Sequence, residues 1–159
     1  MESSGLPAIV SYYAAGWISL EQMMVDGDLT AEEEEACADV LDVLKNSVKG
    51  KTLGPKDPPA ELKPIDFLNY IINLKHEAFT LGWITNKGIE MSLDQKLDAA
   101  KKKLEQGQNS TAKNILNALI NEVEAQGCET YDNCLKGKHL LPEAYALLKY
   151  NVLYLIERL

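Results

Sequence analysis

The fold is decided by the segment PIDFLNYIINLKHEAFTL, residues 64–81. Its apolar residues recur at steps of four and three, at Phe67, Ile71, Leu74, Ala78 and Leu81. This spacing places them on one face of an α-helix, and a proline such as Pro64 is well accepted in a first helical turn. The segment therefore predicts an amphipathic helix whose apolar face must pack against other elements.

Three further helices are predicted after this segment, because the same spacing continues to the end of the sequence. Their apolar positions are Ile89, Leu93, Leu97, Ala100 and Leu104; then Ala112, Leu116, Leu119 and Val123; then Ala144, Leu148, Val152, Leu155 and Leu159. The first is predicted to end near Gly107, the second to be capped by Ser110 and stopped by Gly127, and the third to begin at Pro142. Short connections, apart from the 127–141 loop, favour antiparallel packing as a bundle.

Two more helices are predicted before residue 64. Leu6, Ile9, Tyr13 and Trp17 recur at steps of three and four and predict a short helix from about Pro7. Thr30 starts a Thr-x-x-Glu capping box, which predicts a helix over residues 31–48. Convincing alternation of β-branched residues is not found, so the predicted fold class is all-α. The expected architecture is a helical bundle of about six helices, with a four-helix C-terminal unit and an N-terminal helical pair.

Charge is distributed unevenly between two parts of the sequence. Residues 1–60 contain eleven acids and four lysines, whereas residues 61–159 contain thirteen acids and twelve bases. Between the predicted helices lies GKTLGPKDPP, residues 50–59, whose prolines argue against both helix and strand. The predicted domains are an acidic N-terminal helical segment over 1–50, a Pro/Gly-rich linker over 51–63 and a helical bundle domain over 64–159.

The overall composition excludes several classes of protein. With 159 residues, 46% of them hydrophobic and 25% charged, the chain has the composition of an ordinary globular protein. A net charge of −8 argues against a nucleic-acid partner, since such proteins gain affinity by neutralising phosphates. An uncharged apolar run long enough for a membrane span is lacking. The uncharged stretch 5–20 lacks the preceding basic cluster of a signal peptide, so an exported protein would be represented here in its mature form.

The second unit carries a distinctive set of motifs. These are SLDQKLDAA at residues 92–100, the pattern Gly-x-x-x-x-Ala-x-x-x-Leu-x-Ala-Leu-Ile-Asn-Glu-Val at 107–123, and GKH at 137–139. With these motifs, residues 65–159 resemble the FIMAH-type helical domain, a small module appended to large secreted or cell-surface proteins of bacteria and archaea. The resemblance implies an extracellular or cell-surface location and supplies no catalytic residues and no cofactor. The insert at 127–136 and the first sixty residues depart from the family's pattern.

The insert contains two of the three cysteines. Cys128 and Cys134 bracket five residues, and an exported protein would close this loop as a disulfide. The extracellular habit implied by the resemblance favours the same pairing. The alternative takes both cysteines and His139 as zinc ligands, but the spacing lacks a Cys-x-x-Cys pair and a fourth ligand is not evident. Cys37 is interpreted as a buried, unpaired thiol on the apolar side of its helix.

The remaining polar and charged residues that could form a site are interpreted as solvent-exposed surface or helix-capping residues. His76, beside Glu77 on the polar side of its helix, is expected to be a solvated surface histidine. The acidic stretch from Asp26 could attract calcium, but it fails the twelve-residue EF-hand pattern, and a helix-capping acidic face is favoured. The lysines at 101–103 are interpreted as a solvated helix face.

Aromatic residues supply the remaining candidate site. Tyr12, Tyr13 and Trp17 on the predicted first helix, together with Trp83, could form a patch that stacks on a carbohydrate or binds a partner. The alternative is that these rings lock a small helical core.

The sequence therefore predicts a non-catalytic accessory module of an exported or cell-surface protein that binds a protein or glycan partner. Neither a catalytic residue, nor a metal, nor a cofactor is expected. Two rival hypotheses stay open. One is a structural subunit that self-associates in a surface assembly, and the other is a small enzyme or ligand carrier with a pocket between the two units.

Overall fold

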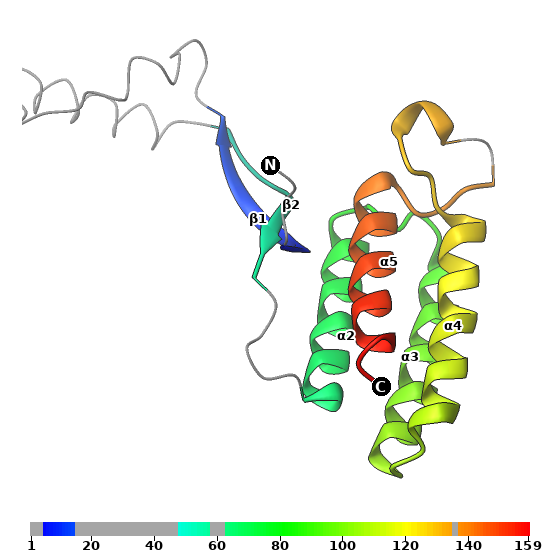
Figure 1. Cartoon of the computed structure of the whole chain (residues 1–159). Coiled ribbons are helices and arrows are strands. Elements are labelled where there is room, and N and C mark those ends of the chain that lie inside the picture. Colours follow the sequence, from blue (N-terminus) through cyan, green and yellow to red (C-terminus); the bar gives the residue numbers. More distant parts are fainter. Residues whose placement is uncertain (1–4, 15–47, 58–62, 135–136) are drawn as a thin grey trace, which may run out of the picture. The chain divides into compact units, whose positions relative to one another are not determined.

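The computed structural model describes residues 5–14, 48–57, 63–134 and 137–159 (Figure 1). These residues form two strands and four α-helices. The connection that leads into the last helix contains one turn of 3-10 helix. The bounds are β1 Leu6–Ala14, β2 Val48–Lys56, α2 Pro64–Thr80, α3 Lys87–Glu105, α4 Asn109–Gln126, η2 Tyr131–Asn133 and α5 Pro142–Ile156. The chain divides into two compact units, one of Met1–Ile9 with Leu53–Leu159 and the other of Val10–Thr52.

The four helices form a bundle in which each packs against two others. Contacts join α2 to α3, α3 to α4, α4 to α5 and α5 back to α2 (Figure 1). Its core is built mainly of leucines, isoleucines, valines and alanines from all four helices, with a few aromatic residues. The residues with no exposed surface include Leu68, Ile71, Leu93, Leu97, Leu116, Leu119, Leu148 and Leu155. Burying each such leucine or isoleucine contributes roughly 1.5–3 kcal/mol, which makes this packing the main source of stability. The helices predicted after residue 63 are therefore present.

Local side-chain and backbone chemistry explains both ends of α3, whereas the cap predicted for α4 is wrong. Asn86 caps α3, because its side-chain oxygen accepts hydrogen bonds from the backbone N–H groups of Gly88 and Ile89 at 2.8 and 3.2 Å. Gly107 ends the turn after α3 with φ of 71°, a left-handed conformation that favours glycine. Ser110 does not cap α4 as predicted, because it lies inside the helix, one residue after Asn109.

The all-α, six-helix prediction is wrong, because the segment expected as the first helix is a strand. β1 pairs with β2 in a two-stranded antiparallel sheet, and β2 also occupies part of the stretch that was predicted to be neither helix nor strand. β1 has the sequence LPAIVSYYA, and its isoleucine, valine and tyrosines favour strands. Both strands are edge strands of the described sheet, and proline, present in them as Pro7 and Pro55, is tolerated in edge strands.

Within the larger unit, the paired strand ends pack on the helical core. Leu6, Ile9 and Leu53 are partly buried against it. The Asn151 side chain, which has no exposed surface, donates hydrogen bonds to the carbonyl oxygens of Pro7 and Leu147, both at 2.8 Å. This amide therefore ties the start of β1 to α5.

The remaining predictions about the first sixty residues fall mostly outside the described residues. The helix predicted over 31–48 lies there except for Val48, which begins β2. The acidic stretch from Asp26 and the thiol of Cys37 lie there entirely. Among the helices that are described, none combines the length and the apolar character needed to cross a membrane.

Candidate functional site

Ionisable side chains from α2 and α3 converge at one point of the bundle. The ammonium nitrogen Nζ of Lys75 lies 2.5 Å from Oε1 of Glu90, 2.6 Å from Oδ1 of Asp94 and 2.9 Å from Nδ1 of His76. We call these four residues the Lys75 cluster. Lys75 and Glu90 are buried, whereas the His76 side chain is 54% exposed and that of Asp94 is 29% exposed. The cluster therefore extends from the core to the surface.

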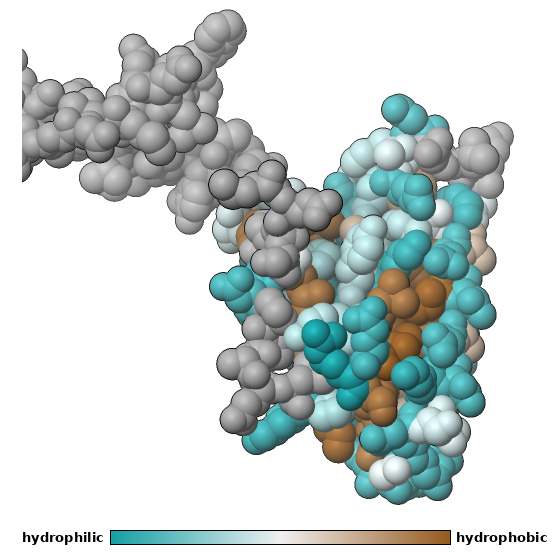
Figure 2. All heavy atoms as spheres, in the orientation of Figure 1, coloured by the Kyte–Doolittle hydropathy of each residue, from teal (hydrophilic) through white to brown (hydrophobic). Residues whose placement is uncertain are grey.

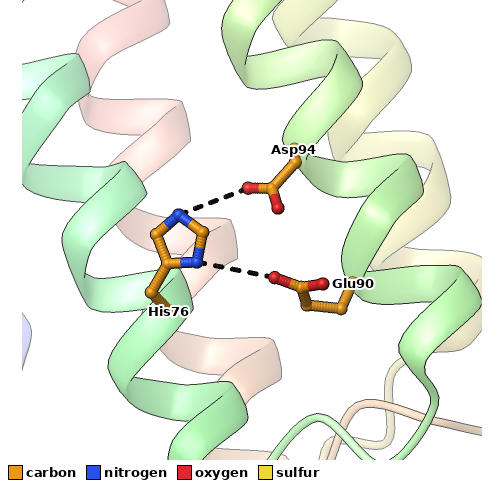
Figure 3. A group of neighbouring side chains, drawn as sticks. All are labelled: His76, Glu90 and Asp94. Atoms are coloured by element: carbon orange, nitrogen blue, oxygen red, sulfur yellow. Dashed lines mark ion pairs between the residues drawn. The ribbon is translucent and has the colours of Figure 1, made fainter.

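The helical spacing explains why these groups meet. Glu90 and Asp94 are four residues apart near the start of α3, so their carboxylates lie one turn apart on the same face. Lys75 lies among the buried residues of α2, next to Leu74 in the sequence. Figure 3 shows the two ring nitrogens of His76 facing the carboxylates of α3, with Nδ1 3.5 Å from Glu90 Oε1 and Nε2 3.6 Å from Asp94 Oδ1.

The surroundings of Glu90 keep its carboxylate charged. Burial raises its pKa, but the hydrogen bonds from Lys75 and Lys87 and the positive charge of Lys75 together outweigh this and lower the pKa to about 2. Lys87 Nζ binds the second oxygen, Oε2, at 2.8 Å. Both oxygens of this buried carboxylate therefore have a cationic partner, as buried charges require.

Sequence reasoning missed this cluster. His76 was predicted to be a solvated surface histidine, and its ring is indeed more than half exposed, but it also contacts Lys75 and lies close to both carboxylates. The available signal was Lys75, a charged residue four positions after the buried Ile71, opposite a Glu90–Asp94 pair with helical spacing. A charge on an apolar helix face requires an opposite charge from another element.

Acid unfolding tests the charge state of this cluster. Glu90 has a folded-state pKa of about 2 against an ordinary value of 4.5, so its stabilising contribution is complete above about pH 4.5 and is lost as the pH falls towards 2. The loss should be about 3 kcal/mol. Urea unfolding at several pH values between 6 and 2 measures it. Glu90→Gln should show a flatter decline over this range, and equal slopes for the two chains would contradict the assignment.

A second candidate is an open groove where β1, β2 and α5 meet in the larger unit. It has a volume of about 540 Å³ and is lined by Gly5, Leu6, Pro7, Leu53, Gly54, Tyr150 and Tyr154. We call it the tyrosine groove. None of these lining residues carries a charge at neutral pH. Tyr150 is 52% exposed, and Tyr154 follows it by one helical turn.

The two tyrosines differ in how firmly they are held. The ring of Tyr154 packs against that of Phe67, with centroids 5.5 Å apart, and the guanidinium of Arg158 lies 3.4 Å from its centroid. Tyr150, by contrast, is among the large hydrophobic residues that stay exposed. The groove thus combines a fixed ring with an accessible one.

A smaller pocket of about 280 Å³ lies beside α2. Its lining combines the apolar or aromatic residues Leu6, Phe67 and Tyr70 with the charged residues Lys56, Asp57, Lys63 and Asp66. Lys56 Nζ lies over the Tyr70 ring at 5.1 Å from its centroid. Burial, with a smaller contribution from the charge of Glu77, raises the pKa of Tyr70, so its hydroxyl stays protonated at neutral pH.

The two cysteines of the insert lie at disulfide-bonding distance. The Cα atoms of Cys128 and Cys134 are 5.1 Å apart, within the usual range for a disulfide. A sulfur in a disulfide is not available as a thiolate ligand, so this pairing is incompatible with the zinc alternative. His139 instead contacts the Thr85 hydroxyl at 3.5 Å through Nδ1. Tyr131, inside the loop, donates to Glu143 at 2.5 Å and so attaches the loop to α5.

Thiol alkylation tests this pairing directly. The unreduced, denatured protein should take up one alkyl group, on Cys37, and the reduced protein should take up three. Replacing both paired cysteines by serine should lower the free energy of unfolding by about 2 kcal/mol, since the closed loop is short. Uptake of three groups before reduction would show that the bond is absent.

The predicted aromatic patch is placed only in part. Trp83 is 9% exposed and belongs to the core, which leaves little of its ring available for stacking. Tyr12 and Tyr13 lie in β1, not on a helix. Their side chains and the whole of Trp17 lie outside the described part of the structure. The patch as a whole stays a prediction.

Apolar side chains also reach the surface of the bundle. On the face shown in Figure 2, they gather in a band between α4 and α5, bordered by hydrophilic residues.

Comparisons with known proteins add no relative from which a role for this surface could be drawn. The chain matches no family model, no curated protein and no solved structure.

Proposed function

We propose that this chain is a non-catalytic accessory module of an exported or cell-surface protein and that it binds a neutral glycan in the tyrosine groove. The observation that carries the proposal is the exposed ring of Tyr150 beside the fixed ring of Tyr154 in an uncharged groove. Sugar rings pack their apolar faces on aromatic side chains, while the phenol hydroxyls can hydrogen-bond to sugar hydroxyls. A groove without charge in its lining favours a neutral ligand over an ionic one.

Two further features support an accessory role outside the cell. A disulfide between Cys128 and Cys134 is typical of an oxidising compartment. The resemblance of residues 65–159 to the FIMAH-type domain implies the same setting. The Lys75 cluster does not favour an enzyme, because each of its charged groups is already paired with another within the cluster or with Lys87.

Retention on insoluble polysaccharides tests the proposal. The full chain is mixed with cellulose, chitin, starch and mannan, and the bound fraction is measured against protein concentration. Saturable binding to at least one of them is expected, and Tyr150→Ala should weaken it about tenfold, which corresponds to about 1.4 kcal/mol. Tyr131→Ala is the matched control, because Tyr131 is also exposed, at 62%, but lies outside the groove.

The outcomes separate the alternatives. Binding that both tyrosine variants weaken equally would remove the groove from the proposal. Absence of binding to all four polysaccharides would overturn the neutral glycan as ligand. A discrete oligomer in light scattering would favour the hypothesis of a self-associating structural subunit, particularly if the Tyr150→Ala variant were monomeric.

A further inference from the structure

We infer that His76, Glu90 and Asp94 form a cation site whose resident cation is the Lys75 ammonium, so that the chain excludes divalent metals there and uses its own lysine as the cross-link between α2 and α3. The inference concerns the Lys75 cluster and does not depend on the proposed function. It assigns to this cluster the role that a bound structural metal has in other small domains.

The ligand types are those of a metal site. One imidazole nitrogen and two carboxylate oxygens, from His76, Glu90 and Asp94, lie within 4.8 Å of one another. Imidazole and carboxylate together suit Zn²⁺, Co²⁺ and Mn²⁺. In Figure 3 the three side chains point toward a common space between the helices.

The position that a metal would take is filled by Lys75. Its Nζ lies within 2.9 Å of one atom from each of the three ligands, at hydrogen-bonding distance. The lysine side chain has no exposed surface, so the ammonium reaches the ligands from the core side. A metal ion could approach only from the solvent side, past His76 and Asp94, and would then have to displace the ammonium.

Charge balance also favours the lysine over a metal. The two carboxylates of the cluster, from Glu90 and Asp94, are balanced by two lysines, Lys75 within the cluster and Lys87 beside it. Adding a divalent ion to this partly buried group would leave two uncompensated positive charges, which is costly away from water. Removing Lys75 reverses the situation, because one negative charge is then unpaired and the space for an ion is open.

Metal-dependent thermal unfolding of the full chain tests the inference. Wild type should unfold at the same temperature, within 1 °C, in 100 μM Zn²⁺ and in EDTA. Lys75→Ala should be less stable in EDTA but should gain at least about 5 °C from 100 μM Zn²⁺, as expected for an ion that binds only the folded state. Lys75→Ala/His76→Ala is the matched control and should lose most of this gain.

If Lys75→Ala does not fold without metal, circular dichroism gives the answer. Zn²⁺ should then restore the helical signal of Lys75→Ala and not that of the double variant. Co²⁺ in place of Zn²⁺ should give a visible absorption band with Lys75→Ala only. The inference is overturned if wild type gains as much from Zn²⁺ as Lys75→Ala does, or if Zn²⁺ neither stabilises nor refolds Lys75→Ala.

Discussion

Lys75→Met is expected to lower the free energy of unfolding by about 3–5 kcal/mol, the usual cost of removing one partner from a buried ion pair. The methionine fills most of the space, so the loss reports on charge more than on volume. Glu90, which is 3% exposed, keeps Lys87 as its only cationic partner at hydrogen-bonding distance among the described side chains. Urea unfolding at pH 7, followed by circular dichroism, measures the change.

Two comparisons separate this explanation from a general effect of losing a lysine. Lys96→Met removes a pair with Glu122 of similar length, 2.8 Å, but with both side chains partly exposed, and should cost at most about 1 kcal/mol. Lys75→Met/Glu90→Met removes both buried charges and should recover a large part of the loss. If the double variant is no more stable than Lys75→Met, the unpaired carboxylate is not the cause.

Gly127→Ala should cost about 3 kcal/mol, at the upper end for an overpacked site. A Cβ at this position would lie 2.6 Å from the carbonyl oxygen of Val123 and still nearer to Cδ2 of Tyr145. Gly127 itself has an ordinary extended conformation, so the cost would come from contact and not from backbone strain. The Tyr145 ring cannot move freely, because it is buried and its hydroxyl accepts a hydrogen bond from Lys149 at 2.6 Å.

Gly107→Ala is the matched control, since at this glycine the backbone is strained for alanine but the surrounding space is open. Its Cβ would meet nothing within 4 Å, but its φ of 71° is left-handed, which should cost roughly 1–2 kcal/mol. Chemical denaturation of both variants under the same conditions gives the comparison. A larger loss for Gly107→Ala than for Gly127→Ala would contradict the close packing of the α4 end against α5.

The Lys75 cluster could not be predicted from the sequence, although each of its residues is visible there. The spacing of Glu90 and Asp94 and the position of Lys75 are visible in the sequence, but their pairing is not, because several acids and bases lie on the predicted helices. Which of them meet depends on the relative rotation of α2 and α3. That rotation is set by the packing of their apolar faces and not by either helix alone.

The tyrosine groove could not be predicted from the sequence either. The sequence predicts the aromatic site at Tyr12, Tyr13 and Trp17, on the expected first helix, together with Trp83. Trp83 instead belongs to the core, and the exposed Tyr150 lies on the last helix beside residues of β1 and β2. The groove joins segments that are far apart in the chain, so local spacing does not reveal it.

The sequence by itself determined the four helices from residue 64 onward, and it favoured the pairing of Cys128 with Cys134 that the structure contains. Helical periodicity, prolines in first turns and a five-residue spacing between cysteines are local properties. The tertiary structure alone decided that residues 6–14 form a strand with residues 48–56 and that Lys75 meets Glu90 and Asp94. Strand pairing and the compensation of a buried charge both require a partner distant in the chain, and only the folded molecule specifies that partner.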